Sequence, residues 1–229
     1  MNLLSDKIHN YQVKHVLSQE LIKTSQEYYV LAVLKYAFPE RFSGLQKSET
    51  PDLQDVKKSL GVEVTWGDSH ISEIISGESY KYTQANTQAD KEKCLKKIRK
   101  NGGDRNLVLT SYPLSTSEGS LTCIQKAFQN KKSKIEKYRQ NVQCIGLAMI
   151  IDIPIIIISD YHWEESLTNQ NNNGFDFAVL VHWSGVDLYD FNTKKYIFKM
   201  ISKQEMLTLK KIGRLTAEGI ITVEDDVWI

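Results

Sequence analysis

Two neighbouring segments, PDLQDV at residues 51–56 and LGVEVTW at residues 60–66, decide the fold that we expect for this chain. The second segment is rich in valine and ends on an aromatic residue, which is typical of a strand. The polar residues 57–59 between the segments are typical of a short turn. The two segments therefore predict a β-hairpin.

The strand at residues 60–66 carries a glutamate between two valines. Because side chains alternate between the faces of a strand, we expect Val62, Val64 and Trp66 on one face, and Glu63 and Thr65 on the other. A carboxylate in a central strand is costly to bury without a partner, and a metal ion is a common partner. Burial rules alone allow a glutamate on an edge strand facing water equally well.

A second carboxylate is expected close to Glu63. With the turn centred near Ser59, Asp52 falls within about two positions of the point opposite Glu63. Two converging carboxylates suit Mg²⁺ or Mn²⁺, and such an ion polarises a phosphodiester and activates water for attack. Taken alone, an aspartate that follows a proline is more often a simple turn residue.

Helices are expected on both sides of the hairpin in the sequence. Residues 18–37 have helical spacing, with Ser18 as the N-cap and Pro39 just beyond the end. Glu27 lies within this helix, where a solvated position is favoured over a catalytic one. A basic helix is expected over residues 121–140, with Ile124, Phe128, Ile135 and Tyr138 as its buried stripe.

The remaining elements follow from local patterns. Residues 43–50 are expected to form a polar turn region, and residues 90–100 a basic helix. A capping box at Ser202 and Glu205 predicts a helix through Lys211. Strands are expected at residues 106–111, 144–151, 155–159, 175–182, 186–190 and 195–200, and at 219–223 as an edge strand.

Pro51-Asp52, ten intervening residues and then Glu63-Val64-Thr65 resemble the PD-(D/E)XK motif of restriction-endonuclease-like nucleases. The segments around the motif also resemble a group of uncharacterised bacterial proteins of that superfamily. The resemblance implies an α/β fold with a mixed central sheet flanked by helices, here with additional C-terminal strands. It implies one domain over residues 1–229, with a core at about 18–151 and an insertion at about 67–105.

The resemblance also implies roles for individual residues. Asp52 and Glu63 would be ligands of a Mg²⁺ or Mn²⁺ ion, and the carbonyl of Val64 would complete the site. Glu27 would be an additional ligand or an acid behind the ligands. The implied activity is hydrolysis of phosphodiester bonds, with DNA favoured over RNA as the substrate and with a homodimer as a common way to cut two strands.

One position departs from the motif. The family's lysine, which orients the attacking water, is replaced by Thr65, whose hydroxyl holds a water but carries no charge. Related nucleases recruit a lysine from another element, and the candidates here are Lys126, Lys132 and Lys134, with Lys134 favoured. If none of them reaches the site, the chain is a catalytically silent member of the fold that binds nucleic acid or a protein.

Charge and composition limit these alternatives. The net charge of the 229-residue chain is +1, so a nucleic-acid surface must be a local patch. The basic stretches at residues 90–100 and 126–139 are candidates, because in the nuclease-like fold both would flank the hairpin, although a solvated helix face is the commoner explanation. An interaction protein without any nucleic-acid role stays a third alternative.

Other features predict a cytoplasmic protein outside the membrane. The three cysteines are widely spaced without a C-x-x-C pair, which favours a reducing compartment over a disulfide framework. The most apolar run, at residues 145–158, is too short to span a bilayer and is interrupted by Asp152 and Pro154. The sequence contains no phosphate-binding loop, dinucleotide fingerprint or serine-hydrolase motif.

Overall fold

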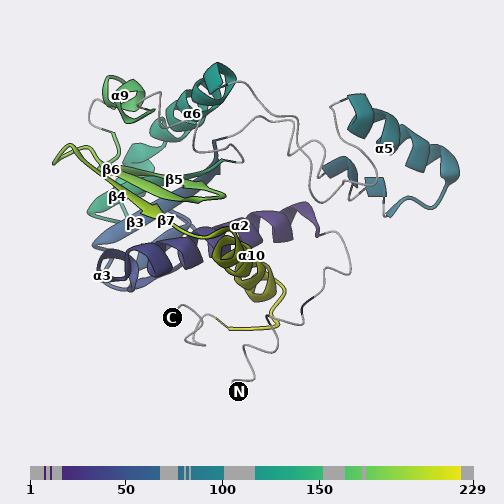
Figure 1. Ribbon diagram of the computed structural model, residues 1–229, viewed down its shortest axis with the longest axis horizontal. Coiled ribbons are helices and arrows are strands. Elements are labelled where there is room, and N and C mark those ends of the chain that lie inside the picture. Colours follow the sequence, from purple (N-terminus) through teal and green to yellow (C-terminus); the bar gives the residue numbers. More distant parts are fainter. Residues whose placement is uncertain are drawn as a thin grey trace.

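A seven-stranded mixed sheet forms the centre of the computed structural model (Figure 1). The structure describes residues 8, 11, 17–67, 77–79, 81, 82, 84–100, 117–151, 163–171 and 174–222. The strands follow one another across the sheet in sequence order: β1 (Leu45–Lys47), β2 (Leu53–Asp55), β3 (Leu60–Trp66), β4 (Cys144–Ile150), β5 (Phe177–His182), β6 (Gly185–Asp190) and β7 (Lys195–Met200). The predicted α/β class with a mixed sheet is therefore confirmed.

The type of strand pairing changes twice across the sheet, from antiparallel to parallel and back. The strands β1, β2 and β3 pair antiparallel, as do β5, β6 and β7. Between these two meanders, β4 runs parallel to β3 and β5 runs parallel to β4. Parallel neighbours need a long crossover connection, and the helices between β3 and β4 belong to such a crossover. Strand β3 of the hairpin is therefore the direct neighbour of the central parallel strand β4 in the sheet.

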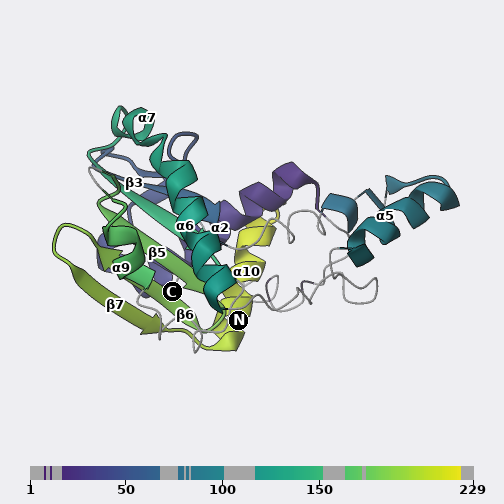
Figure 2. The same ribbon diagram turned by 90° about the horizontal axis from the view of Figure 1, so that it is seen from above.

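Helices cover both faces of the sheet, as Figures 1 and 2 show. On one face lie α2 (Gln19–Ala37) and α10 (Lys203–Ala217), with α3 (Pro39–Phe42) after α2; on the other lie α6 (Ser117–Lys132), α7 (Ile135–Arg139) and α9 (Trp163–Thr168). In both views α5 (Gln88–Lys100) stands apart from the sheet. None of the helices in the described ranges is long and apolar enough to cross a membrane.

Two hydrophobic clusters fill the layers above and below the sheet. Val62 and Val64 belong to the cluster under α2 and α10, whereas Leu147 and Met149 of the neighbouring strand belong to the cluster under α6. The alternation of side chains along β3 and β4 explains this division. The prediction that Val62 and Val64 share one face is confirmed, and Glu63 consequently projects toward the side of α6.

Several predicted elements are confirmed within a residue or two. Ser18 caps α2, and its hydroxyl oxygen accepts a hydrogen bond from the Leu21 N–H at 3.3 Å. The basic helix predicted at residues 90–100 is α5, and the strands predicted at residues 144–151, 175–182, 186–190 and 195–200 are β4 to β7. The capping box at Ser202 and Glu205 opens α10. The predicted strands at residues 106–111 and 155–159 lie outside the described residues.

Four predictions about elements were wrong or incomplete. The segment at residues 43–50 contains β1, and the helix predicted at 121–140 is divided into α6 and α7. The division lies at residues 133–134, where the Lys134 N–H donates to the Lys131 carbonyl at 2.9 Å, three residues back instead of four. Helix α10 continues six residues beyond Lys211, and residues 219–222 form turns and bends instead of a strand. The short helix α9 was not predicted.

The last strand, β7, forms an exposed edge of the sheet. Its side chains Tyr196, Phe198 and Met200 are exposed, Met200 by 81%. One buried polar cluster attaches the strand: the Tyr196 hydroxyl donates to Asp187 of β6, and the His182 ring of β5 lies with Nε2 3.0 Å from the same carboxylate. These contacts join the three strands of the C-terminal meander.

A close approach at Gly61 holds the hairpin against its neighbours. A Cβ at this position would lie 2.5 Å from the Pro51 ring and 3.0 Å from the Val142 side chain. Only a residue without a side chain therefore allows Pro51 to pack on β3 beside the paired strands.

We predict that Gly61→Ala lowers the free energy of unfolding by about 1–3 kcal/mol, because an added methyl group overpacks this contact. Urea denaturation of the purified protein measures the change. Gly44→Ala is the matched control, because a Cβ there meets nothing closer than 3.8 Å. Equal stability of the two variants would contradict the prediction.

Candidate functional site

The hairpin places two buried carboxylates next to each other. Leu53 at the start of β2 pairs with Val62, so Asp52, just before β2, lies at the position opposite Glu63 of β3. Asp52 is 4% exposed and Glu63 is 6% exposed. One oxygen of Asp52, Oδ2, accepts a hydrogen bond from the Val64 N–H at 2.9 Å. This bond crosses the hairpin and fixes the aspartate side chain against the strand that carries the glutamate.

The other oxygen of Asp52 faces a lysine from helix α2. Lys23 Nζ lies 3.6 Å from Asp52 Oδ1 and 3.3 Å from Glu27 Oε1. Burial lowers the pKa of Lys23, but the nearby Asp52 and Glu27 carboxylates outweigh it, and the pKa lies above its ordinary value. The ammonium group therefore stays charged and links the hairpin to the helix.

Glu27 is buried, which corrects the expectation of a solvated helix position. It is 3% exposed, and Lys47 of β1 approaches its Oε2 to 2.9 Å. Burial raises the pKa of Glu27, and the Asp52 charge raises it further, while Lys47 and Lys23 act in the opposite direction. Helix α2 thus brings a third acid, Glu27, close to the hairpin. Lys23 links Glu27 to Asp52, because its ammonium lies near both carboxylates.

Glu63 is paired with a lysine from the helix on the opposite side. Lys131 Nζ, near the end of α6, lies 2.5 Å from Glu63 Oε1. Lys131 was not among the three lysines considered from the sequence. The ammonium of Lys132 donates to the Gln170 carbonyl instead, and Lys134 is the N-cap of α7.

A signal for Lys131 is present in the sequence. It lies three residues after Phe128 and seven after Ile124, both of which are buried against the sheet. Residues at these spacings share one face of a helix. The face that packs on the sheet therefore also carries the lysine that reaches Glu63.

A tyrosine hydroxyl completes the surroundings of Glu63. Tyr138 of α7 is 3% exposed, and among the described residues its hydroxyl has no hydrogen-bond partner. Burial raises the pKa of Tyr138, and the charge of Glu63 raises it further. The hydroxyl is therefore protonated at neutral pH and carries a hydrogen that it can donate at this site.

The remaining motif positions lie on β3. Val64 contributes its N–H to Asp52 and pairs with Ala148 of β4. Thr65 pairs with Met149 and is partly buried, on the same face as Glu63 by alternation. The basic helix α5 does not flank the hairpin in either view of the molecule (Figures 1 and 2), contrary to the expected arrangement.

The donor chemistry of this site fits a hard divalent cation. Mg²⁺ needs one or two carboxylates and keeps several waters, which Asp52 and Glu63 could satisfy. Within the described ranges, however, no three histidine, cysteine, aspartate or glutamate side chains gather as a metal-binding group. Lysines neutralise the carboxylates in the arrangement observed, so an incoming cation would have to displace Lys131 from Glu63.

No protein family, curated protein or solved structure matches the chain. The resemblance to the PD-(D/E)XK motif consequently depends on the residues of the hairpin and on their surroundings. Two geometric features bear on this resemblance. Asp52 and Glu63 are buried at opposed positions of the hairpin, and each carboxylate is paired with a lysine.

The raised pKa of Glu27 predicts a pH-dependent stability. Because its pKa in the folded state lies above the ordinary value of 4.5, the folded state binds this proton more tightly than the unfolded state. The resulting stabilisation is complete below the ordinary value and is lost as the pH rises through the folded pKa. Glu27→Gln removes this loss, so its stability relative to wild type should increase from pH 4.5 toward neutrality.

Urea denaturation of both proteins across this pH range measures the difference. Glu20→Gln is the control, because Glu20 is exposed on the same helix. A difference between Glu27→Gln and wild type that does not change with pH would refute the prediction.

Proposed function

We propose that this chain is a metal-dependent nuclease of the PD-(D/E)XK type that hydrolyses phosphodiester bonds of DNA. The observation that carries the proposal is the pair of buried carboxylates, Asp52 and Glu63, with Lys131 against Glu63. The order of elements supports it. A helix that bears an acid precedes the hairpin, and helices and a strand parallel to β3 follow, as in the restriction-endonuclease-like fold.

Asp52 and Glu63 would hold a Mg²⁺ or Mn²⁺ ion, with the Val64 carbonyl and Glu27 as further candidates. When bound, such an ion polarises the phosphodiester and lowers the pKa of a water molecule. The hydrogen bond from the Val64 N–H holds Asp52 in place for this role. Lys23 places its positive charge within 3.6 Å of Asp52 and 3.3 Å of Glu27.

Lys131 would take the part of the lysine that the motif lacks at Thr65. Its ammonium reaches the motif glutamate from a neighbouring helix and supplies the positive charge that a threonine cannot. Such a charge stabilises the negative charge that develops on phosphate oxygens during the reaction. In this proposal the hydroxyl groups of Thr65 and Tyr138 form hydrogen bonds to a water molecule or to Glu63. Lys134 takes no part in the chemistry.

A specific observation favours a second candidate, a catalytically silent member of the fold that binds nucleic acid or a protein. Lys23, Lys47 and Lys131 together place three positive charges against the three carboxylates. The site is therefore balanced in charge without any metal ion. In this alternative the lysines serve only to offset the desolvation cost of the three buried carboxylates.

The proposal places the protein in the cytoplasm, acting on DNA as a monomer or a homodimer. Cys94, Cys123 and Cys144 are not joined in disulfides, which is compatible with a reducing compartment. Burial raises the pKa of the Cys144 thiol to about 11, so this cysteine is poorly suited to form a disulfide at neutral pH.

We predict that Asp52→Asn and Glu63→Gln each lower Mn²⁺-dependent DNA cleavage by about 100-fold or more, because each removes a charged ligand. A plasmid-nicking assay measures the rate, and calorimetric titration of Mn²⁺ measures binding on the same samples. Glu49→Gln is the control, since Glu49 is exposed and lies on the same segment. If wild type cleaves DNA and both variants cleave it at the same rate, the metal site is refuted. If wild type binds DNA without a metal ion and does not cleave it, the silent alternative is established.

We predict that Lys131→Met lowers the cleavage rate by about 100-fold, the usual effect of removing one charge-stabilising donor. Lys126→Met is the matched control, because Lys126 is an exposed lysine on the same helix. The double variant Glu63→Gln/Lys131→Met tests folding, because it removes both charges of the ion pair together. If Lys131→Met folds and cleaves at the wild-type rate, Lys131 does not replace the motif lysine.

A further inference from the structure

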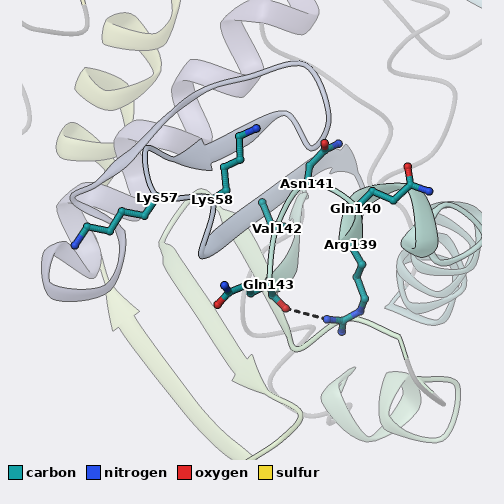
Figure 3. Close-up of a pocket in the computed structure, with 7 residues that line it drawn as sticks. All are labelled: Lys57, Lys58, Arg139, Gln140, Asn141, Val142 and Gln143. Carbon is teal, nitrogen blue, oxygen red and sulfur yellow. Dashed lines mark hydrogen bonds between the residues drawn. The ribbon is translucent and has the colours of Figure 1, made fainter.

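A polar pocket of about 370 Å³ lies at the end of the hairpin, beside the carboxylate site (Figure 3). Its walls are the turn between β2 and β3 and the loop between α7 and β4. Seven residues line it: Lys57, Lys58, Arg139, Gln140, Asn141, Val142 and Gln143. The lining contains three basic side chains, three amides and one valine, without any carboxylate.

This composition suits an anion with many acceptor oxygens. Amide and ammonium groups supply hydrogen-bond donors, and the missing carboxylates leave the positive charge of the lysines unopposed within the lining. Arg139 is already engaged: its guanidinium donates to the Gln143 and Gly174 carbonyls and to Asp176. It therefore orders the wall, whereas the exposed Lys57 and Lys58 provide the charge for a ligand.

The backbone of the turn holds Lys58 in an unusual conformation. Its φ is 55°, in the left-handed region that favours glycine or asparagine. The turn is fixed by the Lys58 N–H, which donates to the Asp55 carbonyl at 3.0 Å, and by the Gln143 N–H, which donates to the Lys58 carbonyl at 3.2 Å. In Figure 3 the side chain of Lys58 extends to the same side as Asn141, and Lys57 extends away from them.

Direct contacts join the pocket to the carboxylate site. The Asn141 side chain donates to the carbonyl of Thr50, two residues before Asp52. From Leu60, at the pocket end of β3, to Glu63 is three strand positions, or about 10 Å.

We propose that this pocket is a binding subsite for a backbone phosphate of the nucleic acid, at the turn of the hairpin that carries Asp52 and Glu63. The inference rests on the proposed function, because it names the part of the same substrate that lies beyond the reacting bond. Lys58 binds the phosphate with its ammonium, Lys57 adds charge at the rim, and Asn141 keeps the loop in register with the segment that carries Asp52.

Binding of a fluorescein-labelled 20-nucleotide single strand, measured by anisotropy in EDTA over a series of salt concentrations, tests the subsite without any cleavage. For Lys57→Gln/Lys58→Gln we expect weaker binding and a slope of log affinity against log salt that is shallower by about 1.4, since two phosphate-directed charges are lost and each contributes about 0.7 on a single strand. The matched control is Lys194→Gln/Lys195→Gln, at another exposed turn where Lys194 also has a φ of 55°.

The outcomes separate this inference from the catalytic proposal. A selective loss in the Lys57/Lys58 variant supports the subsite even if wild type cleaves nothing with Mn²⁺. Equal losses in both double variants, or no DNA binding by wild type, overturn it. A calorimetric titration with inorganic phosphate forms the last arm: loss of phosphate binding in the Lys57/Lys58 variant, with DNA binding unchanged, would assign the pocket to a free phosphate and refute the nucleic-acid subsite.

Discussion

The burial of three carboxylates is the constraint on which the arrangement of the hairpin and its helices depends. Glu27, Asp52 and Glu63 are almost completely removed from water. Each buried charge costs several kcal/mol unless an opposite charge and hydrogen bonds compensate for it. The compensating lysines come from α2, β1 and α6, so the need to neutralise the acids ties the helices on both faces to the same corner of the sheet.

The site combines a rigidly held carboxylate with flexible basic partners. Asp52 is fixed by a backbone N–H that belongs to a strand paired on both sides. The lysines, in contrast, are long side chains whose ammonium groups move without any change in the backbone. In the proposed function, an incoming cation would replace an ammonium while the carboxylates keep their places, and the displaced ammonium would remain near the site.

Much of the fold could be predicted from the sequence because its decisive elements have strong local signals. The alternation of valines along β3, the capping box of α10 and the buried stripe of α6 and α7 all appear in the structure. The strand β1 was missed because it has only three residues, two of them polar, and exists through its pairing with β2. The break between α6 and α7 is a local change from i−4 to i−3 backbone hydrogen bonding at Lys134, which leaves no strong signal in a basic helical sequence.

The carboxylates were easier to predict than their partners. Asp52 and Glu63 are close because the register of one short hairpin makes them so. The burial of Glu27 and the contact of Lys131 with Glu63 depend on how whole helices pack across the sheet. Spacing along a helix shows which residues share a face, but the position of that face over the sheet is set by tertiary packing.

The exposed strand β7 also affects how copies of the protein behave toward one another. An open sheet edge that carries Tyr196, Phe198 and Met200 is a template on which another chain can add a strand. Lys195 and Lys199 lie on the same strand, and two such edges brought together would oppose their positive charges. These lysines act as gatekeepers against edge-to-edge aggregation, so changes that neutralise them, such as acetylation, would remove a barrier to self-association without affecting the core.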